Sequence, residues 1–169
     1  DEFNGKPFKP APTADIKLDK GKESEQAVDP ESLKKFLAYL KKLYDDKVAD
    51  VRVSERLVDS PSILVQPGGG PSVQMEKILK MANKDYAFRK KVIEINPDSP
   101  LIREMVRIHE KQPQSPGLED LSWQLFDNML LREGVLEKID SVVPRIQDIM
   151  LTAAKNMAEE EWKRMKEPS

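Results

Sequence analysis

The stretch Val48-Ala-Asp-Val-Arg-Val-Ser-Glu-Arg-Leu-Val-Asp-Ser-Pro-Ser-Ile-Leu-Val65 decides how the rest of the chain is interpreted. Val51 and Val53 alternate with polar residues, as in a half-buried strand. Ser62–Val65 indicates a second strand, reached through a turn at residues 59–61. Three glycines at 68–70 end this strand pair. An amphipathic helix is predicted after them, capped by Ser72 and with one apolar face made by Met75, Ile78, Leu79, Ala82 and Tyr86.

Helical patterns surround these strands. Asp29 followed by Pro30 predicts a helix start, and Ser99 followed by Pro100 predicts another. A third strand is expected at 92–95 and a loop at 111–117. Two more helices are predicted, one from Leu118 to Leu130 and one from about Ile139 to Met157. Helices and a few strands without a regular βαβ alternation indicate an α+β fold with a small three-stranded sheet.

Composition excludes several classes of protein. The net charge is -2 with 34% charged residues, so the basic excess that nucleic acid or an anionic membrane attracts is missing. There is no cysteine, which excludes disulfides, thiol catalysis and cysteine zinc sites and fits a reducing compartment. No membrane-spanning run and no signal peptide are visible, so a cytoplasmic location is expected.

The candidate sites for chemistry are weak. The glycines at 68–70 open a helix, but the spacing of a phosphate loop is absent, so a hinge is the better interpretation. His109, the only histidine, lies near a helix end without a nucleophile elbow and is interpreted as structural. The acidic runs Asp45-Asp46 and Glu159–Glu161 match no cation loop and are interpreted as solvated. No catalytic residue, metal ligand or cofactor is therefore expected in this chain.

Two questions stay open on pattern alone. The first is whether the helix from Ser72 to Tyr86 packs on the strands or stays exposed and holds partners. The pattern slightly favours packing, although Val73 and Met81 lie off the main stripe and widen its apolar coverage. The last two helices form the chain's own helical layer or pair with a second copy, and periodicity favours neither.

Residues 48–61 resemble a segment near the start of the C-terminal domain of the ninety-kilodalton heat-shock protein chaperones, and the bacterial branch of that family looks closest. The likeness continues through Ser72-Val-Gln-Met75, Ile95-Asn-Pro-Asp-Ser-Pro100 and residues 123–131. Residues 1–8 are similar to the end of that family's middle domain. The resemblance covers residues 1 to about 151, and 48–61 and 95–100 are its most specific parts.

The resemblance implies an ATP-driven dimeric clamp whose ATP and magnesium site lies in upstream domains, so this chain is expected to bind and dimerise without hydrolysing anything. Non-native client proteins and a second copy are the expected partners. The implied client-binding residues are Val73, Met75, Ile78, Leu79 and Met81. The implied dimer interface, an intersubunit four-helix bundle, contains Leu125, Met129, Val143, Ile146, Ile149, Met150 and Ala153. A homodimeric adaptor without chaperone activity is the rival hypothesis.

The expected organisation has three parts. Residues 1–28 are the end of a middle domain and a polar linker, 29–158 the C-terminal dimerisation domain, and 159–169 a charged tail. The chain ends Lys166-Glu-Pro-Ser169, without the acidic peptide that eukaryotic cytosolic members offer to co-chaperones. Docking of that kind is not expected. Residues from about 152 onward exceed the usual bacterial ending, and a longer helix and a disordered tail both fit them.

Overall fold

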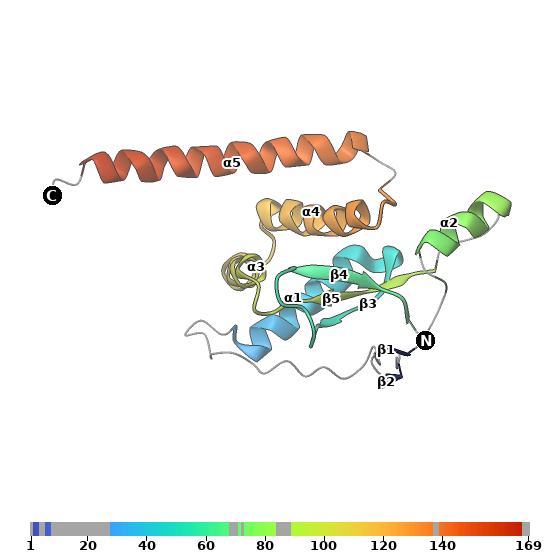
Figure 1. The fold of residues 1–169 in the computed structure, drawn as a ribbon. Helices are drawn as coiled ribbons and strands as arrows, with labels where there is room; N and C mark the ends of the chain where they lie inside the picture. The colour runs from blue at the N-terminus through green and yellow to red at the C-terminus, as the bar shows by residue number, and fades with distance from the viewer. Residues whose placement is uncertain are drawn as a thin grey trace.

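The computed structural model describes residues 2–3, 6–7, 28–67, 71, 73–83, 89–136 and 139–166 (Figure 1). Two short strands, β1 (Glu2–Phe3) and β2 (Lys6–Pro7), pair with each other. The described residues from 28 onward form five helices, three strands and one short 3-10 helix. In chain order they are α1 (Pro30–Tyr44), η1 (Asp45–Lys47), β3 (Val48–Val53), β4 (Ser62–Val65), α2 (Val73–Ala82), β5 (Lys91–Ile95), α3 (Pro100–Lys111), α4 (Pro116–Arg132) and α5 (Ile139–Lys166).

The three-stranded sheet confirms the predicted α+β class but not the predicted strand pair. β3 and β4 are not neighbours, because β5 lies between them, parallel to β3 and antiparallel to β4. β5 is the most buried of the three strands, and its Ile93 and Ile95 are fully buried. A strand covered on both faces belongs in the centre of a sheet, and β5 therefore displaces the expected β3–β4 contact.

The segment between β3 and β4 is fixed to the end of β5. The Ser54 amide donates to the Ile95 carbonyl at 2.8 Å, and the Asn96 side chain donates to the carbonyls of Val58 and Ser60 at 3.0 and 3.2 Å. Glu94 accepts hydrogen bonds from Arg52 and Arg56 at 2.7 and 3.1 Å. Residues 48–61 and 95–100, the most specific parts of the family resemblance, therefore lie side by side and are joined by these hydrogen bonds.

The hydrophobic core lies between the sheet and helices α1, α3 and α4. α1 packs against β3, α4 packs against β4, and α3 contacts both helices. The predicted cap of α1 is present, since the Asp29 carboxylate accepts from the Ser32 amide at 2.9 Å. The fully buried side chains include Phe36, Leu40, Tyr44, Ile93, Ile95, Ile102, Met105 and Leu118.

Two helix starts, those of α3 and α4, differ in detail from the sequence predictions. Ser99 precedes α3 as expected, but its side chain makes no capping hydrogen bond. α4 begins at Pro116, inside the segment predicted to be a loop. Gly134 has φ 65°, a left-handed conformation that suits glycine just after the end of α4. α5 accommodates Pro144 near its start, where a missing amide disturbs few helical hydrogen bonds.

Candidate protein-binding surfaces

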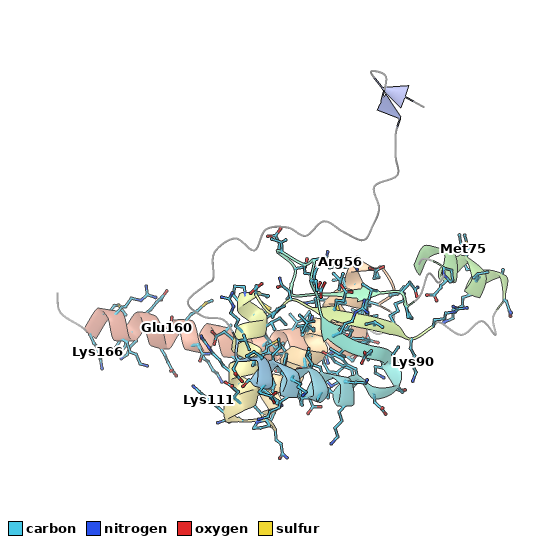
Figure 2. The ribbon with its side chains drawn as sticks, turned by 90° about the horizontal axis from the view of Figure 1, so that it is seen from below. Arg56, Met75, Lys90, Lys111, Glu160 and Lys166 are labelled. Carbon is cyan, nitrogen blue, oxygen red and sulfur yellow. The ribbon has the colours of Figure 1, made fainter. Side chains whose placement is uncertain are left out.

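Helix α2 projects from the sheet and exposes its apolar side chains (Figure 2, where Met75 is labelled). Met75, Ile78, Leu79 and Met81 are 49%, 59%, 36% and 86% exposed. Packing of this stripe on the strands, which pattern alone slightly favours, is therefore wrong for Met75, Ile78 and Leu79, while Met81 lies off that stripe. The side chain of Val73, the fifth candidate client contact, and the predicted glycine hinge at 68–70 lie outside the described residues.

The base of α2 is anchored by a polar group. Glu76 is fully buried, and its carboxylate accepts from the Gln66 side chain at 3.2 Å and from the Arg89 amide at 3.3 Å. The Lys91 ammonium lies 3.5 Å from the same carboxylate and is itself mostly buried. A buried carboxylate is tolerated only when it is paired and hydrogen-bonded, so this cluster fixes where α2 leaves the body. The sequence shows only an acid in the first turn, which gives no signal of this role.

Helix α4 directs its apolar residues into the chain's own core. Leu125 and Met129, two candidates for the dimer interface, are only 2% and 3% exposed. Trp123 and Phe126 pack on the Tyr44 ring with centroids 5.5 and 5.0 Å away. The Tyr44 hydroxyl donates to the Ser122 carbonyl at 2.6 Å. Leu125 and Met129 therefore lie in the core of this chain, beneath its surface.

Helix α5 packs on α4 over its first half and leaves most of its apolar stripe uncovered. Val142 is its one buried residue. Of the remaining interface candidates, Val143, Ile146 and Met150 are 45%, 37% and 63% exposed. Ala153 is also exposed, whereas Ile149 is half-buried. The structure thus brings five of the seven candidates onto one helix and leaves four of them open to solvent.

One ion pair ties α5 to α4. The Arg145 guanidinium donates to the Asp127 carboxylate at 2.5 Å, and both side chains are largely buried. Burial raises the pKa of Asp127, and the nearby Arg145 charge opposes that rise without cancelling it. Nothing in the hydrophobic pattern of the sequence pointed to this pair, because it joins two polar positions in different helices.

Beyond Ile149, every described residue of α5 is exposed. Figure 1 shows the helix running back along α4 and continuing past its N-terminal end, away from α2. It is unbroken across residues 158 and 159, where the charged tail was expected to begin, and it ends at Lys166. Of the two possibilities for the chain after residue 152, the structure shows the longer helix.

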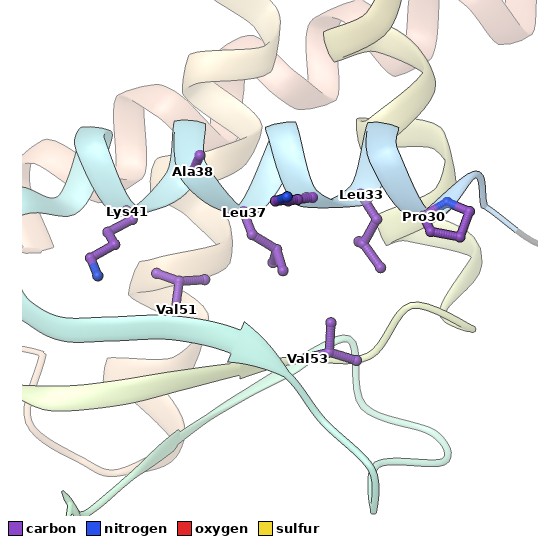
Figure 3. Close-up of a pocket in the computed structure, with 8 residues that line it drawn as sticks. Pro30, Leu33, Leu37, Ala38, Lys41, Val51 and Val53 are labelled. Carbon is purple, nitrogen blue, oxygen red and sulfur yellow. The ribbon is translucent and has the colours of Figure 1, made fainter.

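A groove of about 490 Å³ lies between α1 and β3 (Figure 3) and is lined by apolar side chains such as Leu33, Leu37 and Val53. Lys41 also lines this groove, and its ammonium lies 2.7 Å from the Asp50 carboxylate. His109 packs on the rings of Phe36 and Tyr39, and burial lowers its pKa.

The described residues contain no cluster of three or more His, Cys, Asp or Glu side chains with the geometry to hold a metal ion. None of the helices described is both long and apolar enough to cross a membrane. What remains are two helices, α2 and α5, whose apolar faces are open. The geometry therefore defines a mixed helix-and-sheet domain with exposed apolar side chains on α2 and α5.

Comparison with known proteins identifies the family. The model of the Hsp90 protein family matches residues 1–169. The chain is 38% identical to the chaperone protein HtpG of Oleidesulfovibrio alaskensis over 132 residues, which cover 76% of this chain and 21% of that relative. It is 35% identical to HtpG of Myxococcus xanthus over 137 residues, covering 79% of this chain and 21% of the relative. The chain belongs to the Hsp90 family, and it spans about a fifth of the length of these relatives.

Proposed function

We propose that this chain is the dimerisation and client-contact part of an ATP-dependent molecular chaperone. Two copies associate through α5, and α2 of each copy contacts non-native proteins. The observation that carries the proposal is the uncovered stripe of α5, where Val143, Ile146 and Met150 are all more than a third exposed on one helix. Family membership supports the proposal, since the relatives carry the name of chaperones.

The energetics favour a second copy over water as the neighbour of α5. Burying apolar surface contributes about 25 cal/mol per Å², and the stripe runs along several helical turns. Obligate homodimer interfaces are large and more apolar than the rest of a protein's surface. A continuous stripe on a helix that already rests on α4 has the geometry of one half of a four-helix bundle.

α2 suits a different kind of contact. Its exposed apolar residues include Met75 and Met81, and methionine side chains re-pack readily against varied surfaces. The buried Glu76 holds the helix at its base, so the exposed face is presented outward without covering from the body. This combination suits partners whose own surfaces vary, as those of non-native proteins do.

ATP and magnesium belong to the full-length protein in this proposal. Among the described residues there is no group of three or more His, Cys, Asp or Glu side chains that could hold a metal ion. We assign this chain no step of ATP hydrolysis, and its cytoplasmic location stays a prediction.

Ile146→Asp tests the dimer. The variant places a charge inside the proposed interface, where an unpaired charge costs several kcal/mol, and light scattering at micromolar concentration is expected to show a monomer. Ile146 is 37% exposed in the single chain, so the fold is expected to survive. Thr152→Asp is the control, because Thr152 lies on another side of the same helix and its variant is expected to remain dimeric. An unaffected Ile146→Asp dimer would move the interface elsewhere.

Met75→Asp tests the client surface separately. The variant is expected to dimerise normally but to suppress aggregation of an unfolding client less well than the unmodified chain. Lys80→Asp, on the same helix, controls for added negative charge. If Met75→Asp protects the client fully, α2 is not the client surface. If the unmodified dimer gives no protection at all, the adaptor hypothesis takes its place.

A further inference from the structure

A small pocket of about 230 Å³ lies where the C-terminal end of α4 meets β4 and the start of β5. Its apolar lining comes from β4, from α4 and from the chain just after α4, through Leu64, Phe126, Leu130 and Val135. None of the exposed apolar residues of α2 and α5 described above lines it. The pocket is therefore separate from both surfaces of the proposed function.

The rest of the lining is positively charged. Lys47, Arg89 and Lys91 line the pocket, and no acidic side chain is among its described lining residues. Lys91 faces the buried Glu76 at 3.5 Å, and Lys47 lies 3.5 Å from Asp46 in an exposed pair, which contributes little. Within the described part of the chain, the exposed guanidinium of Arg89 has no ion-pair partner. Positive charge thus lies beside an open apolar surface.

The apolar wall is held in place from behind. Phe126 stacks on the fully buried Tyr44 ring with centroids 5.0 Å apart, and its other ring contact is the edge-on Trp123 at 6.2 Å. The Val135 amide donates to the Leu130 carbonyl at 2.9 Å and fixes the chain after α4. Walls that are already ordered need little rearrangement when they bind a ligand, which lowers the cost of binding.

Size and charge together define the occupant. Sites for whole cofactors or drug-sized ligands usually measure about 300–1,000 Å³. This pocket is smaller and suits a single bulky side chain. Its cations, from η1 and from the start of β5, are placed to attract carboxylates on either side of that side chain.

We propose that this pocket binds a peptide segment of another protein in which one large aliphatic residue is flanked by acidic residues. The aliphatic side chain enters between β4 and α4, and the flanking carboxylates meet the cations of the lining. This inference goes beyond the proposed function, because it depends neither on dimerisation nor on contact between clients and the stripe of α2.

Binding of a labelled peptide to the whole chain tests the charged part of the pocket. The probe is a short fluorescein-labelled peptide with one leucine between pairs of glutamates, and its anisotropy gives the dissociation constant. Arg89→Gln keeps the backbone amide that donates to Glu76 and is expected to weaken binding about fivefold. Lys90→Gln is the matched control, because Lys90 (labelled in Figure 2) is the exposed neighbour and does not line the pocket. Its effect is expected to stay within about twofold.

A second pair of variants tests the apolar part. Val135→Asp places a negative charge in the apolar wall and is expected to weaken binding at least about tenfold. Leu131→Asp is its control, because Leu131 is 64% exposed and does not line the pocket. Two altered peptides test the same chemistry without changing the fold. One has serine in place of leucine and the other has glutamine in place of glutamate, and both are expected to bind at least about tenfold more weakly.

The outcomes decide between this occupant and others. No binding of the leucine peptide, equal binding of the serine peptide, or equal effects of Arg89→Gln and Lys90→Gln would each overturn the proposal. Displacement of the probe by equimolar octanoate would make a small amphiphilic anion the occupant and also overturn it. Met75→Asp and Ile146→Asp are expected to bind the probe as the unmodified chain does. Failure of this pocket is thus distinguishable from failure of the proposed function.

Discussion

Helices α4 and α5 follow each other in the chain and both have amphipathic sequences, yet they have opposite environments. α4 buries Leu125, Phe126 and Met129 in the core of its own chain. α5 buries only Val142, leaves Ile149 half-buried and exposes the rest of its apolar residues. The difference shows that an apolar stripe in a sequence indicates a contact surface but does not identify the element that covers it. In α4 the neighbour is the sheet and α1; in α5 we propose that it is another copy.

The largest effect is expected from truncating a buried leucine in α4, compared with an exposed leucine in the same helix. Leu125→Ala in α4 leaves a cavity at a site that is 2% exposed and is expected to lower the free energy of unfolding by about 2–5 kcal/mol. Leu131→Ala, in the same helix but 64% exposed, is the matched control, with an expected loss of about 0.5 kcal/mol or less. Urea denaturation measures both. Equal losses would mean that α4 does not pack as described.

The connection between the two helices is tested next. Arg145→Ala leaves the buried Asp127 carboxylate without its partner, and a loss of about 1–3 kcal/mol is expected. Arg107→Ala breaks a comparably short but exposed pair with Glu104, and such surface pairs contribute about 0–1 kcal/mol. The difference between the two losses, again from urea denaturation, reports the burial of the α4–α5 contact. A smaller loss for Arg145→Ala than for Arg107→Ala would contradict it.

α2 provides a third case, a helix held at its base by a polar group. Glu76→Gln keeps a hydrogen-bond acceptor but removes the negative charge that faces Lys91. We expect about 1 kcal/mol of global destabilisation, the typical net value of a single polar contact. Amide exchange within Val73–Ala82 is expected to accelerate more than exchange in α4. Glu104→Gln controls for loss of a surface acid, and uniform acceleration across all helices would argue against a local anchor.

The smallest expected effect is a pH dependence at the α4–α5 contact. Burial raises the pKa of Asp127 above its usual value of 3.8, so the folded chain holds this proton at pH values where the unfolded chain has lost it. Stability is therefore expected to fall slightly as pH rises from about 3.8 through the raised pKa. Asp127→Asn removes this titration while keeping an oxygen acceptor for Arg145. Urea midpoints of the two proteins should diverge over that range, and parallel curves would contradict the assignment.

Much of the fold was predictable because it depends on local chemistry. The start of α1, its stripe of Phe36, Leu40 and Tyr44, and the end of α4 near Gly134 all follow from spacing, capping and backbone preference. The position of β5 between β3 and β4 was not predictable, because it depends on contacts between distant segments. The burial of Leu125 and Met129 was missed for the same reason, since periodicity shows a stripe but not its neighbour.

The candidate surfaces were predictable to different degrees. The family resemblance implies a projecting client-contact helix at α2, where the pattern slightly favours packing; its apolar residues are exposed, and their contact with clients stays a prediction. The anchors of both surfaces, Glu76 and the Asp127–Arg145 pair, were not predictable, because each depends on polar groups that meet only in the folded chain. The sequence does not decide between a longer helix and a disordered tail after residue 152, because a highly charged segment is compatible with both.

The central claim is that the open face of α5 is covered by a second copy of the chain. Sedimentation equilibrium of the unmodified chain at micromolar concentration tests it most directly. We predict a mass of twice 19.3 kDa that falls to a single-chain mass for Ile146→Asp. A mass of 19.3 kDa for the unmodified chain at these concentrations would contradict the claim.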